Sequence, residues 1–71
     1  MNIKPECNDF INALNACLEK RDCSTIKGVC GTKEMKRVVG CRSAYLRKEK
    51  GMDWGESMRT AWKDVKKICE G

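Results

Sequence analysis

Histidine is absent from this chain of 71 residues. Its absence removes the side chain that most often serves as a general base, as the partner of a nucleophile or as a metal ligand near neutral pH. The sequence also has no glycine-rich phosphate-binding loop and no Cys-x-x-Cys redox pair. We therefore expect no enzymatic activity, no cofactor and no small-molecule substrate.

Long apolar runs and proline are also scarce. No stretch approaches the roughly 20 apolar residues of a membrane-spanning helix, and residues 1–10 do not resemble a secretory signal peptide. One proline and six glycines argue against a scaffold made mainly of loops. A chain of this length has room for one modest core, so we expect a single domain over residues 1–71.

Cysteine, in contrast, is abundant, with six residues. Small domains usually need cross-links, so we expect disulfide bonds and an oxidising compartment. Zinc is the alternative for these thiols. Structural zinc ligands commonly come as pairs two to four residues apart, whereas the closest cysteines here, Cys17 and Cys23, have five residues between them. We therefore predict no metal site.

Apolar residues recur at helical spacing in three segments of the chain. The first runs from about Pro5 to Lys20. The second follows Thr32, a candidate N-cap, and ends before Gly51, a natural C-cap. The third begins at Asp53, which has the position of a capping residue. The sequence thus predicts an all-α fold.

Four cysteines have a spacing that predicts a disulfide-stapled antiparallel helical hairpin over residues 5–50. Cys7 and Cys17 lie ten positions apart, and Cys30 and Cys41 lie eleven apart. Both separations are about three helical turns, so each pair lies on one side of a helix. We expect the two helices to be joined twice, by Cys7 to Cys41 and by Cys17 to Cys30.

A third helix over residues 53–69 is expected to pack on this hairpin. By elimination Cys69 would pair with Cys23, although six cysteines allow fifteen connectivities. Trp54 and Trp62 lie on the apolar stripe of the third helix, and we expect them to cover the open side of the hairpin. The alternative is that one of them stays exposed and anchors a partner.

The spacings Cys7-x9-Cys17 and Cys30-x10-Cys41 resemble the twin Cys-x9-Cys family, also called coiled-coil–helix–coiled-coil–helix proteins. They are most similar to the branch with the small twin-cysteine subunit of cytochrome c oxidase and its related assembly factor. The resemblance implies a mitochondrial intermembrane-space protein. Its implied function is that of a non-enzymatic accessory subunit or assembly factor of a respiratory-chain complex, in contact with other protein subunits of that membrane-bound complex.

The same resemblance implies an import signal made of an aromatic and an aliphatic residue on one helix face. Phe10 and Leu14 have these positions relative to Cys7 and Cys17, although both would be core residues in any case. Copper transfer is not implied, because the adjacent Cys-Cys pair of the family's copper carriers is missing.

Positive charge is concentrated after residue 26. Residues 1–26 have a net charge of −1 and residues 27–71 a net charge of +6. Such a surface could contact acidic protein, anionic lipid or RNA, or could simply keep the protein soluble. We select Arg37, Arg42, Lys63 and Lys67 as a candidate partner surface. Alternative functions are a nucleic-acid-associated protein of a mitochondrial ribosome or a virus, and a secreted six-cysteine helical ligand.

Overall fold

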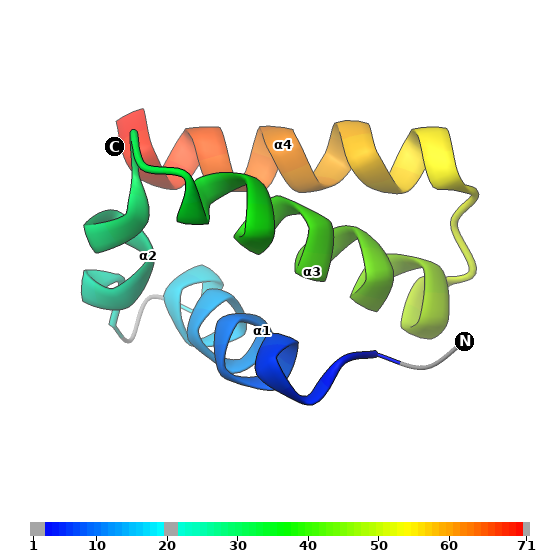
Figure 1. Cartoon of the computed structure of the whole chain (residues 1–71). Coiled ribbons are helices and arrows are strands. Elements are labelled where there is room, and N and C mark those ends of the chain that lie inside the picture. Colours follow the sequence, from blue (N-terminus) through cyan, green and yellow to red (C-terminus); the bar gives the residue numbers. More distant parts are fainter. Residues whose placement is uncertain (1–2, 20–21, 71) are drawn as a thin grey trace.

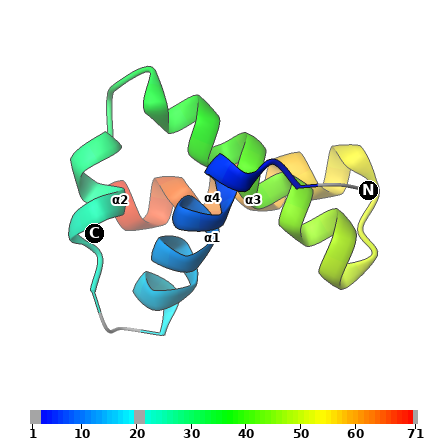
Figure 2. The same cartoon turned by 60° about the horizontal axis from the view of Figure 1, so that its bottom comes forward.

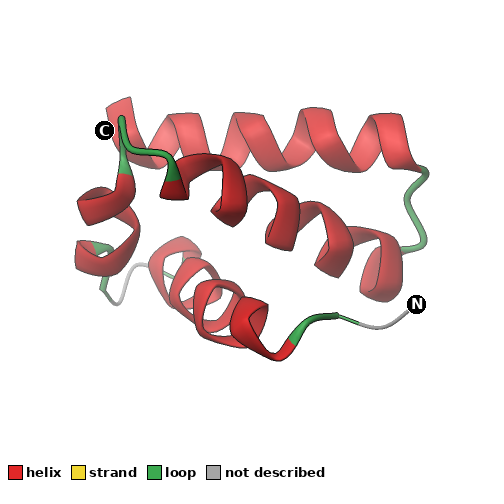
Figure 3. Cartoon of the chain, in the orientation of Figure 1, coloured by secondary structure: helices red, strands yellow, loops and turns green. Residues whose placement is uncertain are grey.

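The computed structural model describes residues 3–19 and 22–70, which form four helices (Figure 1). The described residues contain no β-strand (Figure 3), so the predicted all-α class is confirmed. The helices are α1 (Pro5–Leu18), α2 (Ser24–Val29), α3 (Glu34–Lys50) and α4 (Trp54–Glu70).

Two predicted capping residues stand at the connection between α3 and α4. Gly51 has a φ of 68°, the left-handed conformation that favours glycine, and its N–H donates to the carbonyl of Leu46. The carboxylate of Asp53 accepts the backbone N–H of Glu56 at 2.7 Å. These two caps limit the connection to residues 51–53, and the short connection makes α3 and α4 neighbours.

The predicted N-cap at Thr32 is wrong. The hydroxyl of Thr32 donates to the carbonyl of Val29 at 2.6 Å, and α3 begins only at Glu34. The hydroxyl closes the turn after α2 instead of capping α3.

The short helix α2 lies between the first and second expected helices, where no separate helix was expected from the sequence. It is fixed by Ile26, which is completely buried in the main core. At its start the carboxylate of Asp22 accepts the backbone N–H of Ser24 at 3.0 Å, and hydrogen bonding to Ser24 lowers the pKa of Asp22. This additional helix changes the path of the chain between α1 and α3.

The antiparallel pair of α3 and α4 forms one side of the molecule, and α1 packs against α3 on the other side (Figure 1). The expected arrangement of a disulfide-stapled hairpin with a C-terminal helix packed on it is therefore present. The main core lies between the four helices and consists of Leu14, Cys17, Ile26, Val38, Val39, Leu46, Ala61, Val65 and Ile68. A smaller cluster, formed by Cys7, Ile11 and Cys41, joins α1 to α3.

The disulfide between Cys7 and Cys41 forms as predicted, with the two Cα atoms 5.3 Å apart. It is the one disulfide between α1 and α3. Figures 1 and 2 both show α1 strongly inclined to α3. Because the helices are inclined, a second pair of cysteines three turns further along is not brought together.

The other two predicted disulfides, Cys17 to Cys30 and Cys23 to Cys69, are wrong. Cys17 pairs with Cys23, six residues later, and Cys30 pairs with Cys69. The reason is that Cys30 caps the C-terminus of α2 and lies outside α3. The spacing between Cys30 and Cys41 is therefore not a helical repeat. Instead, Cys30 holds the end of α4 to the connection between α2 and α3.

Candidate binding surface on helix α4

Both tryptophans of the chain are exposed on α4. Trp54 retains 64% of its accessible surface and Trp62 retains 37%, so the expectation that they cover the core is wrong. The side of α4 that packs inward carries smaller side chains, namely Ser57, Ala61, Val65 and Ile68. This side can approach α3 closely, as the 2.8 Å contact between the hydroxyls of Ser43 and Ser57 shows.

The exposed side of α4 has two neighbouring rows of side chains. Residues four positions apart lie above one another on a helix. One row is mostly aromatic and apolar, and the next is cationic. The first row consists of Trp54, Met58, Trp62 and Lys66, and the second of Arg59, Lys63 and Lys67. We call five of the exposed members, Arg59, Trp62, Lys63, Lys66 and Lys67, the α4 outer face. Trp54, at the start of the helix, lies about 180° around the helix from Lys63 and is not part of this face.

Trp62 lies at the centre of this face. Arg59 precedes it by three positions and Lys66 follows it by four, so both cations are its neighbours on the helix surface. Asp64 is two positions further, about 200° around the helix, and contacts Arg42 of α3. Trp62 therefore lies on the side of α4 away from Asp64 and its contact with α3.

The cations of the α4 outer face have no ion-pair partner among the described carboxylates within 4.0 Å. Lys63, Lys66 and Lys67 instead line a shallow groove together with Glu70. Like charges one helical turn apart repel one another. An anion placed between these side chains would relieve that repulsion.

The residues selected as a partner surface from the sequence are not brought together as one site. Lys63 and Lys67 lie on the α4 outer face, whereas Arg37 is an exposed residue of α3 that pairs with a neighbouring glutamate at 3.8 Å. Arg42 is wrong as a surface residue because it is 9% exposed. Its Nη1 donates to Oδ1 of Asn15 at 2.9 Å, so it joins helices inside the molecule.

The two residues of the expected import signal belong to the core of the folded chain. Leu14 is completely buried, and Phe10 is half-buried and packs against both apolar clusters. These positions are explained by packing alone. Their role in import remains a prediction.

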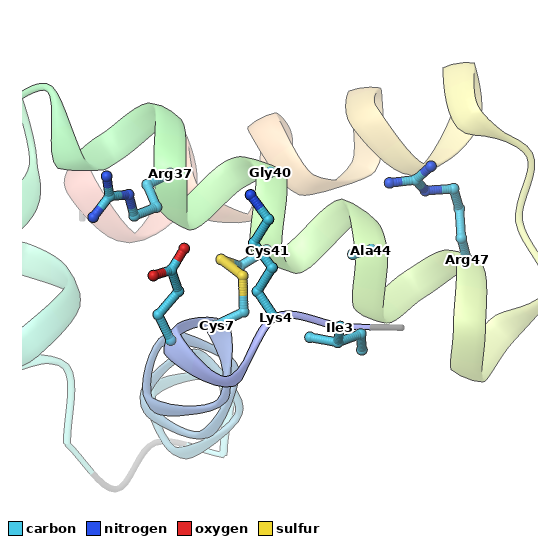
Figure 4. A pocket seen from close by; sticks show the side chains of 9 residues that line it. Ile3, Lys4, Cys7, Arg37, Gly40, Cys41, Ala44 and Arg47 are labelled. Atoms are coloured by element: carbon cyan, nitrogen blue, oxygen red, sulfur yellow. A yellow bond between two sulfur atoms is a disulfide. The ribbon is translucent and has the colours of Figure 1, made fainter. Parts of the chain in front are cut away.

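A second concave region lies beside the Cys7–Cys41 disulfide (Figure 4). It has a volume of about 420 Å³ and is lined by Ile3, Lys4, Glu6, Cys7, Arg37, Gly40, Cys41, Ala44 and Arg47. In Figure 4, Arg37 and Arg47 lie at opposite ends of the groove, and Lys4 extends toward Gly40 between them. Its cations therefore do not converge on one point, and Glu6 adds the opposite charge.

Sequence reasoning missed Arg59 and Lys66 as members of the surface. The available signal was their position three before and four after Trp62. Of the inward stripe it missed Ser57, which is polar, and Ile68, whereas Ala61 and Val65 lay on the apolar stripe that it expected together with the tryptophans.

The chemistry of the described residues is limited in two respects. All six cysteines are in disulfides, so none is available as a nucleophile or as a thiolate ligand. Residues 3–19 and 22–70 contain no helix of the length and apolar character needed to span a membrane.

Comparisons with protein-family models, with curated proteins and with solved structures found no match for this chain.

Proposed function

We propose that this protein is a non-enzymatic, disulfide-stabilised helical module that binds nucleic acid through the α4 outer face. The observation that carries the proposal is the placement of the exposed Trp62 beside the four cations of the α4 outer face, which have no ion-pair partner among the described carboxylates. Phosphate contacts from lysine and arginine supply most of the affinity of such modules, because counterions are released on binding.

The distribution of the charges favours a polyanion over a single small anion. Arg59 and Lys67 lie eight positions apart, about 12 Å along the helix axis, with Lys63 midway between them. The exposed residues of α1 add acidic groups elsewhere on the molecule, including Glu6 and Asp9. This asymmetry would orient the module, with α4 toward the nucleic acid.

A membrane surface is less well matched to α4. A helix that lies in a lipid interface inserts a continuous apolar face among the acyl chains. The continuous apolar side of α4 is already buried, with Ala61 and Val65 completely inaccessible. The surface left free presents one tryptophan, Trp62, beside cations.

The test uses the oxidised protein and fluorescence anisotropy with a labelled 20-nucleotide RNA at several salt concentrations. A triple variant with Lys63→Gln, Lys66→Gln and Lys67→Gln is compared with a matched triple variant of exposed lysines on α3. The matched variant has Lys36→Gln, Lys48→Gln and Lys50→Gln, and it removes the same charge. Three lost phosphate contacts should lower the slope of log K against log salt by about 2.

We expect the α4 triple variant to weaken binding much more than the α3 triple variant. Equal losses in the two variants would show that the attraction is diffuse and that α4 is not the interface. Wild-type binding that does not weaken as salt rises would contradict phosphate contacts altogether, and with them the proposed function.

The respiratory-complex subunit implied by the sequence resemblance is the second candidate. The observation in its favour is that Cys7 and Cys41 pair as predicted from the spacing on which the resemblance rests. The second pairing predicted from that spacing is replaced by Cys17 with Cys23, which weakens its support. The test is whether the protein co-migrates with a respiratory complex of isolated mitochondria on a native gel. Migration as a free small protein would contradict it.

A further inference from the structure

We infer that the nucleic acid bound by the α4 outer face is single-stranded, and that Trp62 stacks on one of its bases. The inference rests on the proposed function and adds the class of nucleic acid and the role of Trp62. The starting observation is that exposed indole surface lies beside cations. Attraction of the cations to phosphate would not by itself require an aromatic side chain there.

The exposed indole surface selects unpaired bases. Inside a duplex each base is already stacked on its neighbours and presents only its edge in a groove. An unpaired base has a free π-face, and stacking on an aromatic side chain contributes about 1–3 kcal/mol per base. Trp54, with 64% of its surface accessible, and Trp62, with 37%, are the two largest aromatic surfaces that the protein offers.

The face offers separate places for the two parts of a strand. A strand running along α4 can place a base over Trp62, and its phosphates over the neighbouring row of Arg59, Lys63 and Lys67. Trp54 lies about 180° around the helix from Lys63, so it does not join Trp62 in this stacking.

The test compares oligo(dT) of 20 nucleotides with a 20-base-pair duplex, measured by anisotropy and by quenching of tryptophan fluorescence. Oligo(dT) is expected to bind more tightly than the duplex and to quench the fluorescence. Trp62→Ala should weaken oligo(dT) binding by about 5- to 150-fold, the range that corresponds to one stacked base. Trp62→Phe, which retains an aromatic ring, should recover most of the affinity.

Leu18→Ala is the control, because Leu18 is another exposed apolar side chain, 41% accessible, at the end of α1. It should leave binding unchanged. Circular dichroism of each variant checks that the helices are intact. Trp54→Ala is a second control, because Trp54 is exposed but lies away from the cations, and it should also leave binding unchanged. Trp62→Leu, which keeps an apolar side chain but no aromatic ring, provides a second measurement if Trp62→Ala perturbs the fold.

The possible results separate this inference from the proposed function. If the lysine variant on α4 loses binding but the Trp62 variants do not, the stacking inference is wrong and nucleic-acid binding stands. Equal affinity for duplex and oligo(dT) also overturns the inference alone. If neither lysine nor tryptophan changes affect binding, both proposals fail. Tryptophan-dependent binding to phosphatidylserine vesicles, with no binding to oligo(dT), would assign the face to a membrane surface instead.

Discussion

The guanidinium of Arg42 lies 3.5 Å from the carboxylate of Asp64, measured from Nε to Oδ2, and links α3 to α4. This Nε makes no hydrogen bond, so the contact with Asp64 is an ion pair only. The hydrogen bond of Arg42 is made by Nη1 to Asn15 of α1, and the guanidinium also lies 5.0 Å from the centre of the Tyr45 ring. One buried cation thus holds three helices together.

Replacement of this cation is expected to destabilise the fold. Arg42→Met keeps an apolar side chain in place but removes the hydrogen bond and the ion pair, and we expect a loss of about 1–3 kcal/mol in the free energy of unfolding. Urea unfolding measures it. Arg37→Met is the control, since Arg37 is exposed and should change stability by less than about 0.5 kcal/mol. Equal effects of the two changes would contradict the internal role of Arg42.

The three disulfides should contribute unequally to stability. Cross-linking restricts the unfolded chain more when the closed loop is longer, which gives about 4 kcal/mol for the 39-residue separation of Cys30 and Cys69 and about 2 kcal/mol for the six-residue separation of Cys17 and Cys23. The other cross-links reduce this contrast. We therefore expect the Cys30→Ala/Cys69→Ala variant to be at least about 1 kcal/mol less stable than the Cys17→Ala/Cys23→Ala variant in urea unfolding.

The pairing itself can be checked on the wild-type protein. Peptide mapping of the protein digested without reductant should recover Cys17 and Cys23 in one linked fragment and Cys30 linked to Cys69. Reduction should add about 6 Da to the intact mass, two for each disulfide. Recovery of Cys17 linked to Cys30 would instead restore the double-stapled hairpin that the cysteine spacing predicts.

Local signals in the sequence were sufficient for the two caps between α3 and α4, but not for the start of α3, where the cap predicted at Thr32 is wrong. Asp53 and Gly51 were predicted as caps, and both act as caps in the structure. The reason is that a cap is decided by the chemistry of a residue and its immediate neighbours. The same holds for Pro5, which stands in the first turn of α1 as expected.

The sequence alone could not predict the features that depend on how the helices cross. The spacing of Cys30 and Cys41 was compatible with a helix, but α2 ends at Val29 and leaves Cys30 outside α3. Periodicity also could not decide which neighbouring stripe of α4 faces inward. Ser57 is buried and Trp62 is exposed because close packing of α3 against α4 favours small side chains, and that packing is a tertiary property.

The buried serine pair gives a test of this close approach. Ser57 donates its hydroxyl to the carbonyl of Trp54 at 2.8 Å, so Ser43 is the donor in the 2.8 Å contact with Ser57. Ser57→Ala leaves the Ser43 hydroxyl unpaired and should lower stability by about 1–2 kcal/mol. The double variant Ser43→Ala/Ser57→Ala should lose less than the sum of the single variants. Simple additivity in urea unfolding would contradict the coupling.

The same substitution at two glycines is expected to have opposite effects. Gly40 lies inside α3 and Gly51 caps its end with a φ of 68°; a Cβ built at either position meets no atom within 4 Å. Gly40→Ala should stabilise the protein by about 0.5–1 kcal/mol, because alanine restricts the unfolded chain and favours helix. Gly51→Ala should destabilise it by about 1–2 kcal/mol, because a Cβ disfavours the left-handed conformation. Thermal unfolding of both variants measures the difference. Since neither site is crowded, a stabilising effect at Gly51 would show that α3 does not end in the left-handed conformation described above.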